Sequence, residues 1–253
     1  MSVTVSVIMP AYNAAGTLKS TLDSLRAQTF SDWELVLVDD GSRDGTLALA
    51  KEMAEADPRI RIFENEANKG VTYTRARAAD LARGEWIAIL DSDDQWAPDK
   101  LEKQLKKAAE TGAELIYTGS AFMDEAGRPL DYYLAAPGTI SLKQLLKQNL
   151  ISNSSVLVKA ALYRTYMVRE SARPIHEDFA CWIAMLKNGV AAAGIDEPLL
   201  IYRVAAGSKS GNKKKAAVMN WNTYRLAGLN PVTAAYYMVW YVVKGLLKYR
   251  HLR

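Results

Sequence analysis

The sequence contains very few of the residues that form covalent cross-links or bind soft metals. Its 253 residues include one cysteine, Cys181, and two histidines, His176 and His251. A single cysteine excludes an internal disulfide framework and a cysteine-built zinc site, and two histidines exclude a histidine-rich site. Any metal bound by this chain is therefore expected to be a hard cation with oxygen ligands.

Long apolar segments are also missing. The longest unbroken one, Ala234–Val243, is too short to span a bilayer, and the start at Met1 lacks the basic region of a signal peptide. With 49% hydrophobic and 24% charged residues, the composition is typical of a globular protein with a large core. We therefore expect a cytoplasmic protein, which need not float free of the membrane.

Acidic residues stop at Glu197, although ten lysines and arginines follow it. The first 197 residues contain 22 basic and 28 acidic side chains, a net charge of −6, whereas the whole chain carries +4. This asymmetry indicates that the C-terminal part meets an anion. A phosphate, a membrane face and a nucleic acid are all compatible with it.

Strand and helix patterns alternate through the first 110 residues. Short β-branched runs are followed by segments whose apolar residues recur at helical spacing. The alternation predicts a mostly parallel sheet flanked by helices. The expected strands are Val3–Met9, Trp33–Val38, Ile60–Phe63 and Trp86–Leu90, and the expected helices are Thr17–Gln28, Thr46–Ala56, Val71–Ala82 and Pro98–Glu110.

The remainder of the chain is less regular, without an internal repeat. Two basic, aromatic-rich helices are expected from residue 213 onward, separated near Gly228–Pro231. Between residues 115 and 202 we expect strands at Leu115–Tyr117, Ser154–Val158 and Leu199–Tyr202, and helices at Ser141–Gln148, Lys159–Tyr166 and Phe179–Asn188.

Polar clusters follow three of the predicted strands, where open α/β sheets bind ligands. They are Pro10-Ala11-Tyr12-Asn13, Asp39-Asp40-Gly41-Ser42 and Asp91-Ser92-Asp93-Asp94. The three carboxylates of the last cluster repel one another, and a divalent cation shared with a diphosphate would relieve the repulsion. Taken alone, the acidic residues also suit a turn and helix cap, and that interpretation stays open.

A further cluster, Asn68-Lys69-Gly70, precedes a predicted helix that carries Arg75. Backbone N–H groups at a helix start, with a guanidinium one turn further on, suit a phosphate or a base edge. An exposed arginine face is the alternative. Asp39 likewise suits either a hydrogen bond to a base or ribose, or a simple turn.

Together these segments resemble family 2 glycosyltransferases of the GT-A fold. The segment His176-Glu177-Asp178-Phe179, followed by Trp182, resembles the Glu-Asp motif of that family. The resemblance runs from Val5 to about Lys215. It implies a Rossmann-like GT-A catalytic domain over residues 1–212, with a nucleotide-sugar-binding half at 1–115 and an acceptor half at 116–212. Residues 213–253 would form a basic C-terminal helical extension.

The resemblance also implies roles for single residues. Asp93 would bind Mn²⁺ or Mg²⁺ bridging the two phosphates of a UDP-sugar. Pro10, Tyr12 and Asp39 would line the uracil pocket, which Arg75 would close, and Asp91 would contact the ribose. The remaining donor-side residues expected from the resemblance are Asn13, Asn68, Gly70, Ser92 and Arg203.

Asp178 would be the general base, removing a proton from an acceptor hydroxyl that then attacks the sugar with inversion. Its alternative role is the N-cap of the predicted helix Phe179–Asn188. Glu177 and Trp182 are expected on the acceptor side. Trp182 could form an acceptor platform there, although an aromatic residue at helical spacing is more often part of the core.

The chain departs from the family at one position. Many relatives have a metal-binding histidine shortly after the segment resembling Tyr202-Arg203, but here Ala205-Ala206 follows. A weaker metal site is one consequence. Another is that Arg203 and Lys209, with nearby serines, hold the diphosphate instead.

The basic extension has two interpretations. Aromatic residues beside lysines suit an interfacial helix on an anionic membrane, whereas packing on the catalytic domain or on a second subunit of a homo-oligomer is the rival. The mobile-looking basic stretch 207–215 resembles a loop that closes over the donor, or is a solvated linker. The overall pattern resembles enzymes of bacterial capsule, O-antigen or teichuronic-type polymers, which implies a polyprenyl-diphosphate-linked saccharide acceptor.

The sequence thus predicts an inverting transferase that moves a hexose or N-acetylhexosamine from a UDP-sugar. The alternative is a catalytically silent nucleotide-sugar-binding subunit of a polysaccharide assembly complex. A pyrophosphorylase would need a basic Gly-rich loop after the first strand, and an NAD enzyme would need a G-x-G-x-x-G turn. Nucleic-acid binding is disfavoured by the acidic N-terminal part.

Overall fold

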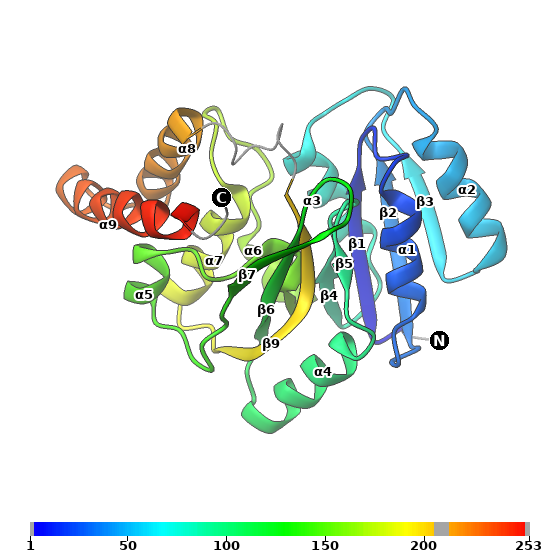
Figure 1. Cartoon of the computed structure of the whole chain (residues 1–253), viewed down its shortest axis with the longest axis horizontal. Coiled ribbons are helices and arrows are strands. Elements are labelled where there is room, and N and C mark those ends of the chain that lie inside the picture. Colours follow the sequence, from blue (N-terminus) through cyan, green and yellow to red (C-terminus); the bar gives the residue numbers. More distant parts are fainter. Residues whose placement is uncertain (1–2, 205–212, 251–253) are drawn as a thin grey trace.

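A computed structural model describes residues 3–204 and 213–250. Within these residues one nine-stranded mixed sheet forms the centre of the molecule, with helices packed against its faces (Figure 1). The strand order is β3-β2-β1-β4-β8-β6-β9-β5, and β7 pairs with β6 outside this path.

The first half of the sheet is parallel, as the sequence predicts. Strands β3, β2, β1 and β4 lie side by side, and the register pairs Ala11 with Asp39 and Asp39 with Glu64. The carboxyl ends of these strands therefore meet at one edge of the sheet. The elements are β1 (Val5–Ala11), α1 (Leu18–Arg26), β2 (Trp33–Asp39), α2 (Thr46–Ala56), β3 (Ile60–Glu64), α3 (Val71–Leu81) and β4 (Trp86–Ile89).

The second half of the sheet is mixed. Strand β8 is antiparallel to β4 and β6, β6 is parallel to β9, and β5 and β7 add antiparallel edges. Its elements are β5 (Gln95–Trp96), α4 (Lys100–Thr111), β6 (Leu115–Met123), β7 (Pro129–Leu134), α5 (Leu142–Lys147), the 3₁₀ turn η1 (Asn153–Ser155), β8 (Leu157–Lys159), α6 (Ala160–Tyr166), α7 (Glu177–Lys187) and β9 (Ala192–Arg203).

Alternation along the strands divides the apolar residues between two cores. In β2, Val36 and Val38 face one core while Leu35 and Leu37 face the other. One core lies under α1, α2 and α4, and the other lies under α3 and the helices α5 to α7. Burial on both faces explains why β1, β2 and β4 are mostly apolar along their whole length.

The C-terminal extension consists of α8 (Lys213–Leu226) and α9 (Pro231–Arg250), as the sequence predicts. The inner faces of both helices join the second core, where Tyr224, Ala234 and Tyr237 are buried. The Tyr224 hydroxyl donates a hydrogen bond of 2.7 Å to the Leu146 carbonyl of α5. Packing on the catalytic domain is therefore part of the role of this extension.

Among the described residues, no helix combines the length and the hydropathy required to cross a bilayer.

Candidate functional site

The site is assembled at the carboxyl edge of the parallel strands. The Asp40 amide donates to the Ala11 carbonyl at 2.8 Å, and the Asn65 amide donates to the Asp39 carbonyl at 2.8 Å. The loops that follow β1, β2 and β3 are thus tied together at their first residues. Because β4 pairs with β1, the acidic segment after β4 joins the same edge.

The carboxylates of the two aspartates at the end of β2 differ in their hydrogen bonds. Both Asp40 carboxylate oxygens accept hydrogen bonds of 2.7–2.8 Å from Asn65, Lys69 and Gly70, so Asp40 holds the loop before α3. Asp39 is buried, and its Oδ2 accepts a bond of 2.9 Å from the Ser42 amide. Its Oδ1 is buried without a hydrogen-bond partner among the described residues.

The loop after β1 is fastened to the loop after β2. Asn13 has a left-handed φ of 50°, its amide donates to Ser42 Oγ at 3.0 Å, and its Oδ1 accepts from the Arg43 amide at 2.9 Å. Tyr12 is 47% exposed, which leaves its ring accessible to a ligand. Pro10 is buried within β1 opposite Val38.

Two glycines with positive φ shape these loops, and the first of them lets the loop after β3 pack closely against the loop after β2. Gly41 has a φ of 72°, and a Cβ there would lie 3.0 Å from the Asn68 amide nitrogen. Gly70 has a φ of 85° and directly precedes α3, and its amide also lies 3.2 Å from Asn68 Oδ1. Asn68 and Gly70 therefore lie against the turn formed by residues 39–42.

The acidic cluster concentrates negative charge at the end of β4. Burial and the neighbouring Asp91 raise the pKa of Asp93 to about 6. Asp94 is buried, and burial followed by Asp93 and Asp91 raises its pKa well above the usual range. Its Oδ1 accepts from the Arg203 amide at 2.9 Å, while Oδ2 is buried without a partner among the described residues.

This electrostatic arrangement fits a bound divalent cation. A raised carboxylate pKa means that negative charge is poorly compensated here, and a cation would compensate it. Among the described residues, however, no three Asp, Glu, His or Cys side chains converge as a complete ligand set. The chemistry therefore suits a cation held by Asp93 together with phosphate and water oxygens, as Mg²⁺ usually is.

Arg75 joins this acidic edge to helix α7. Its Nη2 donates to Asp91 Oδ1 at 2.7 Å, and its Nη1 donates to Glu177 Oε1 at 2.8 Å. Arg75 is only 6% exposed; burial opposes its charge, but the Asp91 and Glu177 carboxylates raise its pKa overall. The alternative of an exposed arginine face is therefore wrong for Arg75.

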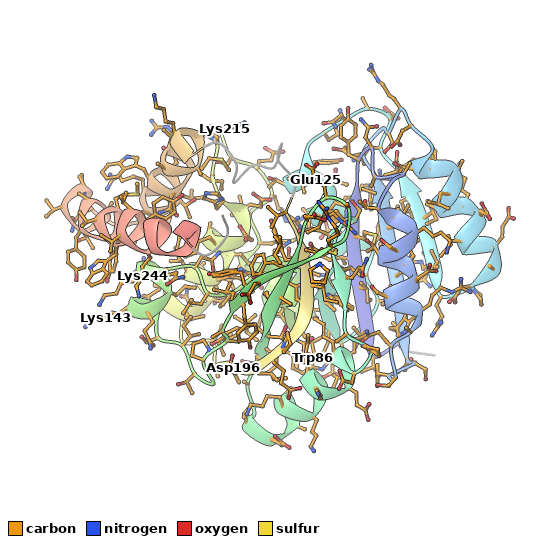
Figure 2. The ribbon with its side chains drawn as sticks, in the orientation of Figure 1. Trp86, Glu125, Lys143, Asp196, Lys215 and Lys244 are labelled. Carbon is orange, nitrogen blue, oxygen red and sulfur yellow. The ribbon has the colours of Figure 1, made fainter. Side chains whose placement is uncertain are left out.

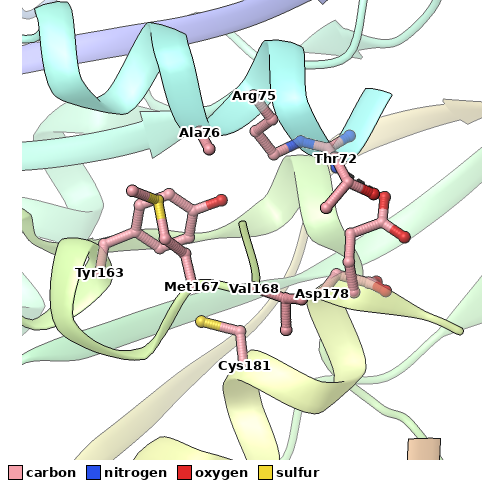
Figure 3. Close-up of a pocket in the computed structure, with 9 residues that line it drawn as sticks. Thr72, Arg75, Ala76, Tyr163, Met167, Val168, Asp178 and Cys181 are labelled. Carbon is pink, nitrogen blue, oxygen red and sulfur yellow. Dashed lines mark hydrogen bonds and ion pairs between the residues drawn. The ribbon is translucent and has the colours of Figure 1, made fainter. Parts of the chain in front are cut away.

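Asp178 lies one residue beyond Glu177, in the first turn of α7. The helix begins at Glu177 and its N-cap is His176, so the alternative role of Asp178 as the N-cap is wrong. Burial and the adjacent Glu177 carboxylate raise the pKa of Asp178. Figure 3 shows Asp178 and Arg75 lining a small cavity that also involves Thr72, Tyr163, Met167 and Cys181.

Trp182 requires a correction. It is completely buried, and its ring packs on Tyr163 with centroids 6.2 Å apart. Helix α7 is covered on most sides, so even a residue one turn from Asp178 faces the core. Trp182 is therefore a core residue and not an acceptor platform.

Ser92 and Arg203 support the acidic segment through its backbone. The Ser92 carbonyl accepts bonds from Thr17 and Thr21 at 2.9 and 3.1 Å. Arg203 Nε donates to the Asp93 carbonyl at 2.9 Å, and its Nη1 donates to the Glu125 carbonyl at 2.9 Å. The predicted phosphate-binding residues Ser208, Lys209 and Ser210 lie outside the described residues, and so does the Ala205-Ala206 pair that stands in place of the family's histidine.

Two further residues reach the acidic cluster without having been predicted. Asn153 Nδ2 donates to Asp91 Oδ2 at 3.2 Å, and Ser154 Oγ accepts from the Asp91 amide at 3.1 Å. Both lie in the 3₁₀ turn that precedes β8. Their Asn-Ser sequence is common in ordinary loops, and only the antiparallel pairing of β8 with β4 brings them here.

Comparison with known proteins bears on the identity of this site. Residues 6–166 match the family described as Glycosyl transferase family 2. The chain is 37% identical over 221 residues to TuaG of Bacillus subtilis (strain 168), named as a teichuronic acid biosynthesis glycosyltransferase, with 87% of each chain covered. It is 32% identical over 247 residues to the Escherichia coli protein WfgD, covering 97% of this chain and 94% of that one. WfgD is named UDP-Glc:alpha-D-GlcNAc-diphosphoundecaprenol beta-1,3-glucosyltransferase.

Solved structures share the fold. S. aureus TarS in complex with UDP-GlcNAc superposes with a TM-score of 0.72 at 21% identity, covering 93% of this chain and 70% of that one. The mannosyltransferase PcManGT from Pyrobaculum calidifontis, in complex with GDP-Man and Mn²⁺, gives 0.67 at 19% identity, covering 90% and 64%. The predicted GT-A architecture is thereby confirmed. The family match over most of the catalytic part, together with the relatives that align along nearly the whole chain, shows that this protein belongs to glycosyltransferase family 2.

Proposed function

We propose that the protein transfers a hexose or N-acetylhexosamine from a UDP-sugar to a saccharide hydroxyl, with inversion and with Asp178 as general base. The observation that carries this proposal is the chain of contacts from Asp91 through Arg75 to Glu177, which connects the edge of β4 to the turn that bears Asp178. A partly buried carboxylate with a raised pKa is a suitable proton acceptor at one end of that chain.

The donor nucleotide would bind over the loops after β1 and β2. Asp39 Oδ1 is a buried acceptor without a partner among the described residues, which suits the N–H of a uracil ring. The exposed Tyr12 ring follows the residue that pairs with Asp39 and suits stacking on that base. Support for UDP comes from TarS, a protein of this fold that is in complex with UDP-GlcNAc and with UDP in other crystals.

Asp93 would bind Mn²⁺ or Mg²⁺ between the enzyme and the donor diphosphate. When bound, such a cation neutralises part of the negative charge that the diphosphate gains as it leaves. Arg203 holds the acidic segment in place, because its amide donates to the Asp94 carboxylate and its Nε donates to the Asp93 carbonyl. The Mn²⁺ in the related PcManGT complex supports the choice of ion.

In the chemical step, Asp178 takes the proton of the acceptor hydroxyl as its oxygen attacks the anomeric carbon. A carbon–oxygen bond to the acceptor forms on one face while the bond to the UDP oxygen breaks on the other, so the configuration inverts. The neighbouring Glu177 carboxylate contributes by raising the basicity of Asp178. Arg75 forms an ion pair with Glu177, which limits how far Glu177 and the adjacent Asp178 can move.

The acceptor is proposed to be linked to a polyprenyl diphosphate, which would place the enzyme peripherally at the inner face of the cell membrane. Support comes from the name of WfgD, whose acceptor is a GlcNAc-diphosphoundecaprenol. The charged residues of α8 and α9 are all basic, which suits an anionic membrane surface. A second copy of the chain is the alternative neighbour for these helices.

Two measurements test the function. UDP is titrated into the wild type by calorimetry with and without Mn²⁺, beside Asp93→Ala; binding that needs both Mn²⁺ and Asp93 supports the donor site, and unchanged affinity of Asp93→Ala refutes its role as ligand. UDP release is then measured with a panel of UDP-sugars and lipid-linked acceptors. Binding of UDP-sugars with no release in any combination would favour a silent nucleotide-sugar-binding subunit.

A separate prediction isolates the base. Asp178→Asn should lower transfer by about three orders of magnitude while UDP affinity stays within about twofold of the wild type, because the base acts only in the chemical step. Both quantities come from the UDP-release assay and the titration above. A parallel loss of UDP affinity would show that Asp178 serves donor binding instead.

A further inference from the structure

A large apolar groove lies between the two C-terminal helices, outside the site described above. Its volume is about 640 Å³, and its walls expose no polar surface. Clefts of this volume accommodate small organic ligands. The lining residues are Ala217, Val218 and Trp221 on α8, and Ala235, Met238, Val239, Val242 and Val243 on α9.

The groove is built by exposed apolar side chains that a solvated helix pair does not need. Val218, Val239 and Val242 are 54%, 64% and 51% exposed, although each helix has another face already buried in the core. The two helices contact each other where the Tyr224 ring lies near the Tyr237 ring and where Asn220 Nδ2 lies 3.5 Å from Met238 Sδ. Exposed apolar side chains of both helices line the groove beside this contact.

The charge around the groove identifies the kind of occupant. Every charged residue in α8 and α9 is basic, and Lys214 and Lys215 are exposed at the start of α8. Figure 2 places Lys215 on α8 and Lys244 on α9, and Lys244 directly follows the lining residue Val243. An apolar groove between two helices whose charged residues are all basic suits a hydrocarbon chain that ends in an anion. A symmetric contact with a second copy would bring these cations together, which is unfavourable.

The opposite face of α8 contacts the segment that leads into the catalytic turn. The His176 amide donates to Thr223 Oγ1 at 3.0 Å, and Asn222 Nδ2 donates to the Pro174 carbonyl at 2.9 Å. Ala216, which is buried beside the His176 ring, immediately precedes the lining residue Ala217. A single helix thus separates the groove from the N-terminus of α7, where Asp178 lies.

From this arrangement we propose that the groove between α8 and α9 binds the isoprenoid chain of a lipid-linked diphosphate acceptor, with basic residues of α8 near its diphosphate. The chain lies in the groove while the saccharide extends over α8 toward Asp178. The proposal rests on the proposed function for the identity of the acceptor, but chain binding itself requires neither a donor sugar nor transfer.

Farnesyl diphosphate tests the groove directly. It is titrated by calorimetry, below its micelle concentration and without detergent, into the full-length protein saturated with UDP and Mn²⁺ so that the donor site is filled. Isopentenyl diphosphate, which has the same diphosphate and a much shorter chain, should bind at least about tenfold more weakly because it buries less apolar surface. Equal affinities for the two compounds would show that only charge is recognised, and would overturn the proposal.

Variants locate the binding. Val239→Asp and Val218→Asp, one on each wall, should each weaken farnesyl diphosphate at least about tenfold, since a carboxylate loses its hydration in an apolar groove. Val232→Asp is the matched control, because Val232 is 81% exposed on the same helix and does not line the groove. It should bind like the wild type. Unchanged affinity in both groove variants would overturn the proposal.

Two other possible occupants of the groove, a lipid bilayer and a second copy of the chain, would give different results. Binding to phosphatidylglycerol vesicles that Val239→Asp abolishes, without any binding of farnesyl diphosphate, would assign the groove to the bilayer. A dimer in sedimentation that Val239→Asp converts to a monomer would assign it to a second copy. UDP titration of the same preparations keeps these outcomes separate from the proposed transferase function, since the donor site is then measured independently of the groove.

Discussion

At the scale of single residues, Arg75 connects the end of β4 to the start of α7, two parts of the site that lie far apart in the sequence. Its guanidinium binds Asp91, 16 residues away, and Glu177, 102 residues away. The sequence predicts that Arg75 closes the uracil pocket and that Asp91 contacts the ribose, and the structure shows these two side chains paired. The contact with Glu177 could not be predicted, because no local pattern encodes a pairing over 102 residues.

We expect Arg75→Met to lower the free energy of unfolding by about 3 kcal/mol, because it leaves two partly buried carboxylates without their cation. Urea denaturation measures this change. Arg75→Lys should recover part of the stability but little of the transfer rate, because a single ammonium cannot bind both carboxylates in the fork geometry. Full activity of Arg75→Lys would contradict a positioning role for the guanidinium.

A second residue-scale prediction concerns Lys100, which is buried without an acidic partner among the described residues. Its ammonium bonds Gln104 Oε1 at 2.8 Å and lies 3.8 Å from the centre of the Trp96 ring. Burial lowers the pKa of Lys100 well below its ordinary value. Above that lowered value the unfolded state binds more protons than the folded state, so this residue makes stability rise with pH up to about 10.4.

Lys100→Met removes this dependence. The wild type should therefore gain stability relative to the variant as pH is raised from 7 to 9.5. Urea denaturation of both proteins across this range provides the comparison. Parallel pH profiles would show that Lys100 keeps its ordinary pKa in the folded protein.

At the scale of elements, α8 is attached to the start of α7 through Thr223. Its hydroxyl accepts from the His176 amide at 3.0 Å and donates to the Met219 carbonyl at 2.9 Å. Thr223→Val keeps the shape but leaves the buried amide without its acceptor, and should cost about 1–3 kcal/mol of unfolding free energy. Transfer should fall further than UDP affinity, since Asp178 lies two residues after His176.

The control for this element is Thr165→Val, whose hydroxyl bonds the Ala161 carbonyl on an exposed face of α6. It should change neither stability nor transfer appreciably. An equal effect of the two substitutions on the transfer rate would argue that the α8 contact has no special relation to the catalytic turn.

Elements also differ in how well the sequence predicts them. The strands β1, β2 and β4 are predicted within about two residues because they are short, mostly apolar segments that end at turn residues. Strand β9 is predicted far too short, since Asp196, Glu197 and Pro198 lie within it. Strands β5 and β7 are not predicted at all. The first has two residues, and the second alternates exposed polar and aromatic side chains at an edge.

The same difference applies to the site. Three of its loops follow parallel strands, and topology alone brings the carboxyl ends of such strands together, so their convergence is predictable. Asn153 and Ser154 arrive through an antiparallel strand whose partner the sequence does not specify. The role of Trp182 depends on which sides of α7 are covered. Helices α6 and α8 pack against α7 and cover it, so the residues of α7 alone do not determine this role.

At the scale of the whole molecule, the division into a catalytic domain and a C-terminal extension is one of sequence composition more than of packing. The extension concentrates the positive charge of the chain, whereas the preceding part is acidic overall. Yet Ala234 and Tyr237 of α9 share a core with Phe179 and Trp182 of α7. A boundary drawn at residue 212 therefore cuts through one of the two apolar cores.

Removing α9 tests this conclusion. A chain ending at Leu229 exposes the surface that Ala234 and Tyr237 cover, and we expect it to lose at least about 3 kcal/mol of unfolding free energy. Val232→Asp, on the exposed face of α9, should remain as stable as the wild type. If the truncated chain instead unfolds at the same urea concentration and still binds UDP, α9 is an independent appendage. If the truncated chain loses both stability and UDP binding, the extension is part of the catalytic core. The groove on its outer face is then held on a rigid support when a ligand binds.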